Sequence, residues 1–277
     1  MSAVEVNKHF EFGLADQTVR KRLREKGIKS FLRKKKTLIS KENERKRMEW
    51  CRAHESWTTE DWEKVLWSDE SPFGLRFKGA RRIYCRADER YLPKNLQATV
   101  KHQQKFNLWC CFSASGVGSL HRIHGSGKNG AMCKEDCLKI LEEEAVQSGQ
   151  ELLGEGFIFQ QDNDPKHTSL VVKDRLSQLE AEGTLINLPW PAQSPDLNPI
   201  EHVWGHLDRR TKDRKCQNLE ELMVELRRGW EELPEDYLKK LVHSMPRRIQ
   251  KVLEAKGGAT KYWHTNHKAH PRQTFHV

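Results

Sequence analysis

Short apolar segments alternate with amphipathic helical segments along most of the chain, and this order constrains the fold more than any other feature. Strands are expected at about 65–71, 81–87, 106–114, 156–162 and 184–190. Helical periodicity is expected at about 133–147, 169–182, 197–211, 218–231, 234–243 and 246–256. Strands separated and followed by helices predict an α/β layered domain with a mixed sheet.

Composition narrows the class of protein further. Hydrophobic residues make up 36% and charged residues 32%, yet 9 Trp and 10 Phe are too many for a disordered chain. No apolar run approaches the ~20 residues that a membrane helix needs, and no secretory signal is visible, so we expect no membrane partner. The seven cysteines are an odd number and predict free intracellular thiols, with Cys110 and Cys111 on opposite sides of a strand.

Positive charge is concentrated at the N-terminus. Residues 1–50 contain 15 Lys and Arg against 7 Asp and Glu, whereas the rest contains 34 against 32. Such an arm indicates a polyanionic partner, usually nucleic acid, although a solvated helix face would have the same composition. Charged helices are expected at 15–26 and 41–53. The candidate DNA contacts are Arg20, Lys21, Arg22, Arg24, Arg33, Lys34, Lys35 and Lys36.

Three acids occupy positions where active sites are often built. Asp69 follows the expected strand VLWS, and Asp162 follows GFIFQQ. Glu201 lies in the first turn of a helix that Asp196 is expected to cap. Carboxylates gathered at one place repel each other unless a cation neutralises them, and hard oxygen ligands select Mg²⁺ or Mn²⁺. The alternative is ordinary capping and solvation.

The residues around these acids are more specific than their positions. WSDES surrounds Asp69, FQQDNDPKHTS surrounds Asp162, and WPAQSPDLNPIEHVW surrounds Glu201. These segments resemble the three signature blocks of the mariner superfamily of DDE transposases, and most closely its Tc-type branch. The resemblance continues through FNLWCCFSASGVG and SMPRRIQKVLEAKGGATKY, and covers about residues 17 to 263.

The resemblance implies a ribonuclease H-like fold, a mixed sheet flanked by helices, with Asp69, Asp162 and Glu201 as the catalytic, metal-binding triad. It implies two Mg²⁺ (or Mn²⁺) ions, cleavage of double-stranded DNA at transposon ends, and strand transfer to a TA target. A homodimer and a nuclear location are expected on the same ground. Asp164 is the alternative for the second acid. Lys166 and His167 are expected to shape the loop below the metals or to contact DNA.

The expected organisation has three parts. Residues 1–59 form a partial helix-turn-helix segment with a basic linker, 60–212 the catalytic domain, and 213–277 a helical C-terminal extension and tail. Only the end of the second helix-turn-helix unit of the family is visible, so we expect incomplete recognition of a transposon end. The alternative function is therefore a transposase-derived DNA-binding protein without catalysis.

Two smaller features accompany the resemblance. Between Asp162 and Glu201 lie 38 residues, more than is typical of the branch, and a longer surface connection would explain the difference. His202 and His206 are four residues apart on the expected Glu201 helix. At least one of these histidines is expected to contact DNA or to pack near the site.

Overall fold

The computed structural model describes residues 3–28, 38–75, 104–127, 130–212, 214 and 216–263. The chain divides into two compact units, Met1–Lys36 and Thr37–Val277. This division differs from the expected boundary at residue 59, because helix α3 (Lys41–Ala53) packs against helix α11 (Met245–Glu254) in the second unit. The basic run at 33–36, the expected strand at 81–87 and the end of the tail lie outside the described residues.

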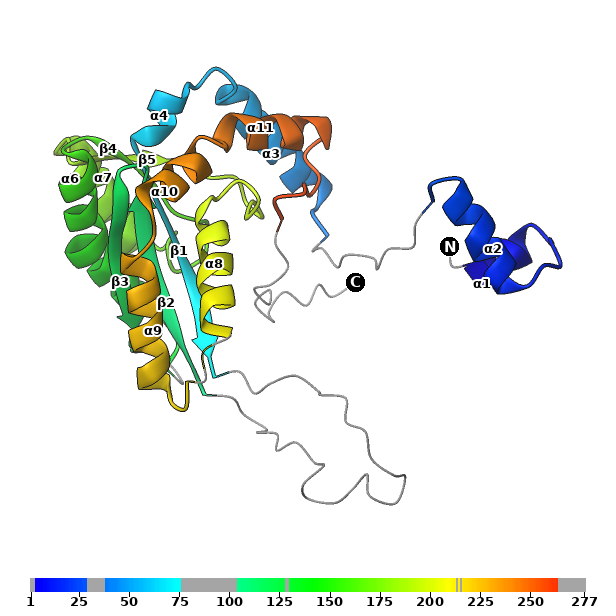
Figure 1. The fold of residues 1–277 in the computed structure, drawn as a ribbon. Helices are drawn as coiled ribbons and strands as arrows, with labels where there is room; N and C mark the ends of the chain where they lie inside the picture. The colour runs from blue at the N-terminus through cyan, green and yellow to red at the C-terminus, as the bar shows by residue number, and fades with distance from the viewer. Residues whose placement is uncertain are drawn as a thin grey trace. The chain divides into compact units, whose positions relative to one another are not determined.

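A five-stranded mixed sheet forms the centre of the second unit (Figure 1). Its order is β3-β2-β1-β4-β5, with bounds Gly116–Ile123, Lys105–Ser113, Val65–Gly74, Phe157–Gln160 and Leu185–Leu188. The β1–β2 and β2–β3 pairs are antiparallel, whereas β1–β4 and β4–β5 are parallel. The predicted ribonuclease H-like mixed sheet is therefore confirmed.

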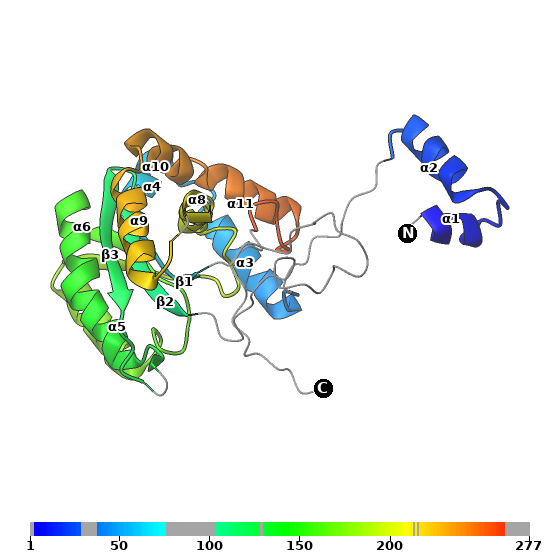
Figure 2. The ribbon, with the colours of Figure 1, turned by 60° about the horizontal axis from the view of Figure 1, so that its bottom comes forward.

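Helices cover both faces of this sheet (Figures 1 and 2). One face carries a continuous helical segment, α5 (Lys134–Ile140), the π-helical turn η3 (Leu141–Ala145) and α6 (Val146–Leu153), together with α7 (Leu170–Ala181). The other carries α8 (Ile200–Lys212), α9 (Leu219–Glu231) and α10 (Glu235–Val242), with α3, α4 (Thr59–Glu63) and α11 beside them. The expected C-terminal extension thus contributes to the main core.

Alternation along the strands explains the two cores. Val65 and Trp67 face the α8 side, whereas Leu66 between them faces the α7 side. Cys110 and Cys111 likewise belong to the two different cores, as predicted. Strands β1, β2 and β4 are largely buried on both faces because helices cover both, and this accounts for their nearly continuous apolar runs in the sequence.

The first unit contains two short helices, α1 (Ala3–His9) and α2 (Asp16–Glu25). Asn7 connects them, because its side chain donates to the Leu14 carbonyl at 2.6 Å and accepts from the Leu14 amide at 3.3 Å. Helix α2 ends before Gly27, whose φ of 75° favours glycine. The predicted helix at 15–26 is confirmed. Within the described ranges, no helix has the length and apolar character required to cross a membrane.

Candidate active site

Sheet register brings Asp69 and Asp162 together. Strands β1 and β4 are parallel, with Trp67 opposite Gln160, and each acid lies two residues beyond its member of this pair. The Ser68 hydroxyl donates to the Gln160 carbonyl at 2.7 Å, which holds the two segments together where the acids emerge. Asp69 does not follow the strand as expected, because β1 continues through it to Gly74 in pairing with β2.

Helix α8 positions Glu201 close to Asp69. The Asn198 side-chain amide donates to the Ser68 carbonyl at 3.1 Å, and its oxygen accepts from the Ile200 amide at 3.2 Å. Asn198 therefore attaches the start of α8 to strand β1 directly beside Asp69, with Glu201 in the first helical turn. Asp69 has the same strand parity as Trp67, so its side chain points toward the face that α8 covers.

The charges of the other two acids act on Asp69. Burial, followed by the charges of Glu201 and Asp162, raises the pKa of Asp69 well above its ordinary value. Burial also raises the pKa of Glu201 to about 7, and the positive charge of Arg248 offsets only part of that rise. A half-buried carboxyl beside two further carboxyls is the arrangement that a divalent cation would relieve.

Asp162 is positioned by a histidine between two acids. His167 Nδ1 lies 2.7 Å from Asp162 Oδ1, and its Nε2 lies 2.9 Å from Glu70 Oε1. Burial alone would lower the pKa of His167, but the charge of Glu70 and the bond to Asp162 raise it to about 12. As an imidazolium it donates to both acids. Burial would raise the pKa of Glu70, yet the charge of His167 lowers it to about 2.

Lys166 and Asp164 complete this network. Lys166 Nζ lies 3.1 Å from Glu70 Oε2 and 3.0 Å from Asp164 Oδ2, and the Asp164 amide donates to Asp162 Oδ1 at 3.0 Å. His167 is buried and Lys166 nearly so, and both contact carboxylates of this network, whereas their expected contact with DNA stays a prediction. Asp164 pairs with Lys166, and Asp162 pairs with His167, so each acid of this segment has a cationic partner.

A buried ion pair supports the loop that leads to Glu201. Arg47 of α3 and Asp196 are both fully buried, with Nη1–Oδ1 and Nη2–Oδ2 distances of 2.8 and 2.9 Å. Arg47 also donates to the Gly257 carbonyl at 2.8 Å, and Asp196 accepts from the Thr260 hydroxyl at 2.9 Å. Asp196 is thus not the expected helix cap. Helix α8 begins four residues later, and the carboxylate of Asp196 pairs with Arg47 instead.

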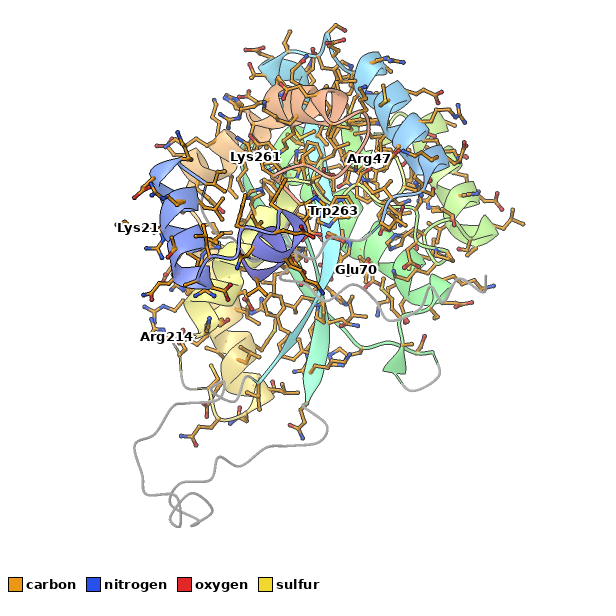
Figure 3. All side chains as sticks on the ribbon, turned by 90° about the vertical axis from the view of Figure 1, so that its right-hand side faces the viewer. Lys21, Arg47, Glu70, Arg214, Lys261 and Trp263 are labelled. Atoms are coloured by element: carbon orange, nitrogen blue, oxygen red, sulfur yellow. The ribbon has the colours of Figure 1, made fainter. Side chains whose placement is uncertain are left out.

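We call the buried ion pair of Arg47 and Asp196 the Arg47–Asp196 clamp, and close packing surrounds it. A β-carbon at Gly257 would collide with the backbone carbonyl of Glu44 in α3, so only glycine permits the approach. The Arg47 guanidinium also lies 5.6 Å from the ring centre of Trp263 (Figure 3). Sequence reasoning missed Glu70, Arg47 and Arg248. Glu70 and Arg248 lie inside family blocks, whereas Arg47 lies outside all of them.

The donor atoms fit a hard divalent cation. Asp69 uses Oδ1 to accept from the Glu70 amide at 2.8 Å, and Asp162 uses Oδ1 for His167 and Asp164. Within the described part of the chain, Oδ2 of each aspartate has no hydrogen-bond partner. Among the same residues, no three His, Cys, Asp or Glu side chains already stand in a ready metal-binding arrangement. The fit therefore rests on the oxygen donors and on the repulsion that the other two acids exert on Asp69.

A ribonuclease H-like sheet with two aspartates beside parallel strands and a glutamate on an adjoining helix defines a DDE-type enzyme. The family model described as DDE superfamily endonuclease matches residues 64–223, and one described as Transposase, of the Tc3 helix-turn-helix type, matches residues 1–56. The chain belongs to the DDE transposases of the Tc type.

Relatives and solved structures agree. The chain is 39% identical to the Tc1 transposase of Caenorhabditis elegans over 89% of this chain and 88% of that one. It is 38% identical to the Tcb1 transposase of Caenorhabditis briggsae with the same coverage. The fold is similar to that of the Mos1 transposase paired-end complex with left transposon end, with a TM-score of 0.77 at 19% identity over 94% of this chain and 76% of that one.

Proposed function

We propose that Asp69, Asp162 and Glu201 bind two divalent cations, Mg²⁺ or Mn²⁺, and that this site cleaves DNA at transposon ends and joins the freed 3′-hydroxyl to a TA target. The observation that carries the proposal is that Asp69 lies half-buried beside two further carboxyls, with no cationic side chain bonded to it among the residues that the structure describes. Structures of Mos1 described as complexes with Mn and with Mg, which share this fold, are consistent with the choice of metal.

The side chains of the site have different roles. When bound, the cations would supply charge stabilisation and an activated oxygen nucleophile. Asp69 and Asp162 each keep one oxygen for the protein and offer the other, and His167 fixes the rotation of Asp162. The triad contains no covalent nucleophile, so water or a DNA 3′-hydroxyl attacks the phosphorus in line. The protein contributes mainly positioning.

The first unit supports DNA binding. Arg20, Lys21, Arg22 and Arg24 are all exposed on α2, within the segment that matches the transposase helix-turn-helix model. We propose that α2 contacts phosphates and the major groove. We also propose a homodimer, since two transposon ends must be joined, and a nuclear location through the basic run Arg33, Lys34, Lys35 and Lys36.

Asp162→Ala is the direct test of the triad. The full chain should nick supercoiled DNA in Mg²⁺ or Mn²⁺, and the variant should lose about 10³-fold or more of the rate. A cation site contributes several kcal/mol and each 1.36 kcal/mol is tenfold. The products are read on a gel against Asp174→Asn, an exposed aspartate on α7. Nicking that survives Asp162→Ala would overturn the assignment. DNA binding without nicking by the unmodified chain would favour the non-catalytic alternative.

His167→Gln tests the positioning of Asp162. Loss of the imidazolium leaves Asp162 free to rotate and Glu70 short of one cation, so the Mn²⁺ concentration for half-maximal nicking should rise about 10- to 100-fold. The matched control is His121→Gln. His121 lies on the edge strand β3, and the change removes its 2.8 Å contact with Glu144. An unchanged Mn²⁺ requirement in His167→Gln would show that Asp162 is held by other means.

A further inference from the structure

A tyrosine near the C-terminal end of the described chain gathers three cationic side chains. Lys261 Nζ lies 5.2 Å from the ring centre of Tyr262, and Arg248 Cζ lies 4.8 Å from it. Arg247 Nε donates to the Tyr262 hydroxyl at 2.7 Å. Lys261 and Arg247 are exposed, whereas Arg248 is buried and donates to the Asp196 carbonyl at 2.8 Å. We call Arg247, Lys261 and Tyr262 the Tyr262 cluster.

The Tyr262 cluster lies beside the helix that carries Glu201. The Tyr262 ring meets the ring of His202 edge-on, with 6.0 Å between centroids, and His202 directly follows Glu201. The same face of α8 continues at helical spacing through His206 and Arg209. Lys261 and Trp263, the two chain neighbours of Tyr262, are labelled in Figure 3.

The way these cations are held differs from that of the surface cations that form ion pairs. Lys239 and Arg228, for example, pair with Glu63 and Glu232. Arg247 and Lys261 have no carboxylate partner among the residues that the structure describes. An aromatic face and a phenol oxygen hold them instead, and neither carries a formal charge. Their positive charge is therefore not cancelled and remains available to an external anion.

We propose that Arg247 and Lys261 bind the sugar-phosphate backbone of the DNA strand that enters beside Glu201, with Tyr262 as the residue that positions both cations. The inference rests on the proposed function and adds to it a phosphate-binding surface outside the triad and outside α2. Charged N–H groups on phosphate oxygens form strong hydrogen bonds, and each contact releases counterions from DNA.

Salt dependence of DNA binding measures these contacts directly. The full chain, in EDTA, is titrated with a short generic duplex at several salt concentrations. Each of Lys261→Ala and Arg247→Ala should reduce the slope of log K against log salt by about 0.9. Tyr262→Phe keeps the ring and should affect only the Arg247 contribution. The matched control is Lys173→Ala, an exposed lysine on α7 at the opposite face of the sheet, which should leave the slope unchanged.

Steady-state nicking then tests whether the contact lies on the substrate strand. The DNA concentration for half-maximal rate should rise about three- to fourfold in Lys261→Ala, with an unchanged rate at saturation. Slopes equal to that of Lys173→Ala would overturn the inference, as would a lower saturating rate without any change in half-saturation. Binding in EDTA does not require catalysis, so failure of the triad proposal would show separately, as an unmodified chain that binds but does not nick.

Discussion

Asp69→Asn should abolish metal-dependent nicking and at the same time stabilise the metal-free protein. The substitution removes a metal-binding oxygen, so the rate should fall by about 10³-fold or more. It also removes a half-buried negative charge that is repelled by Glu201 and Asp162. Asparagine retains an oxygen that can accept the Glu70 amide, which preserves the local hydrogen bond.

The stabilisation should depend on pH with a defined sign. Burial and neighbouring acids raise the pKa of Asp69 in the folded state above its ordinary value of 3.8, so the folded state binds this proton more tightly than the unfolded state. Unfolding free energy therefore falls as pH rises from about 3.8 through the folded pKa. Asparagine does not titrate, so Asp69→Asn does not lose stability in this way. The difference in unfolding free energy between Asp69→Asn and the unmodified chain should be small at low pH and largest at pH 8.

Thermal unfolding in EDTA between pH 5 and pH 8 measures the effect, with Asp174→Asn as the exposed control. Added Mg²⁺ should raise the melting temperature of the unmodified chain and leave Asp69→Asn nearly unchanged, because only the former has the complete donor set. A variant that melts below the unmodified chain at pH 8 in EDTA would contradict this account of the site.

Arg47→Met should destabilise the catalytic unit by about 3–5 kcal/mol, because it leaves the buried carboxylate of Asp196 without its cation. The same change removes the hydrogen bond from Arg47 to Gly257, which connects α3 to the C-terminal segment. Chemical denaturation followed by tryptophan fluorescence measures the loss, since Trp50 lies one turn beyond Arg47 in α3 and Trp263 packs against the Arg47 guanidinium.

Two comparisons sharpen this prediction. Arg45→Met alters the same helix, but Arg45 is exposed and pairs with Glu42 and Glu49 at the surface, so its loss should be nearly neutral. Adding Asp196→Asn to Arg47→Met should cost less than the sum of the two single changes, because the unpaired charge is then absent. An Arg47→Met variant as stable as Arg45→Met would show that the buried pair contributes nothing measurable.

Local sequence was informative wherever the structure depends on neighbours along the chain. Helices such as α2 and α7 follow the apolar spacing of their own residues, and Cys110 and Cys111 alternate because consecutive strand residues do. Asp196 is the instructive failure. An aspartate just before an expected helix ordinarily caps that helix. Here its carboxylate instead pairs with a buried arginine 149 positions away in the chain.

By itself, the sequence determined the alternation of strands and helices, the three family blocks and the identity of the acids within them. Only the tertiary structure decided what holds those acids. His167 and Glu70 are 97 positions apart, and Asn198 and Ser68 are 130 apart. Periodicity and capping act over a few residues, whereas burial and charge pairing depend on which distant segments pack together. In this protein, the register of β1 and β4 and the Arg47–Asp196 clamp determine which distant segments pack together at the site.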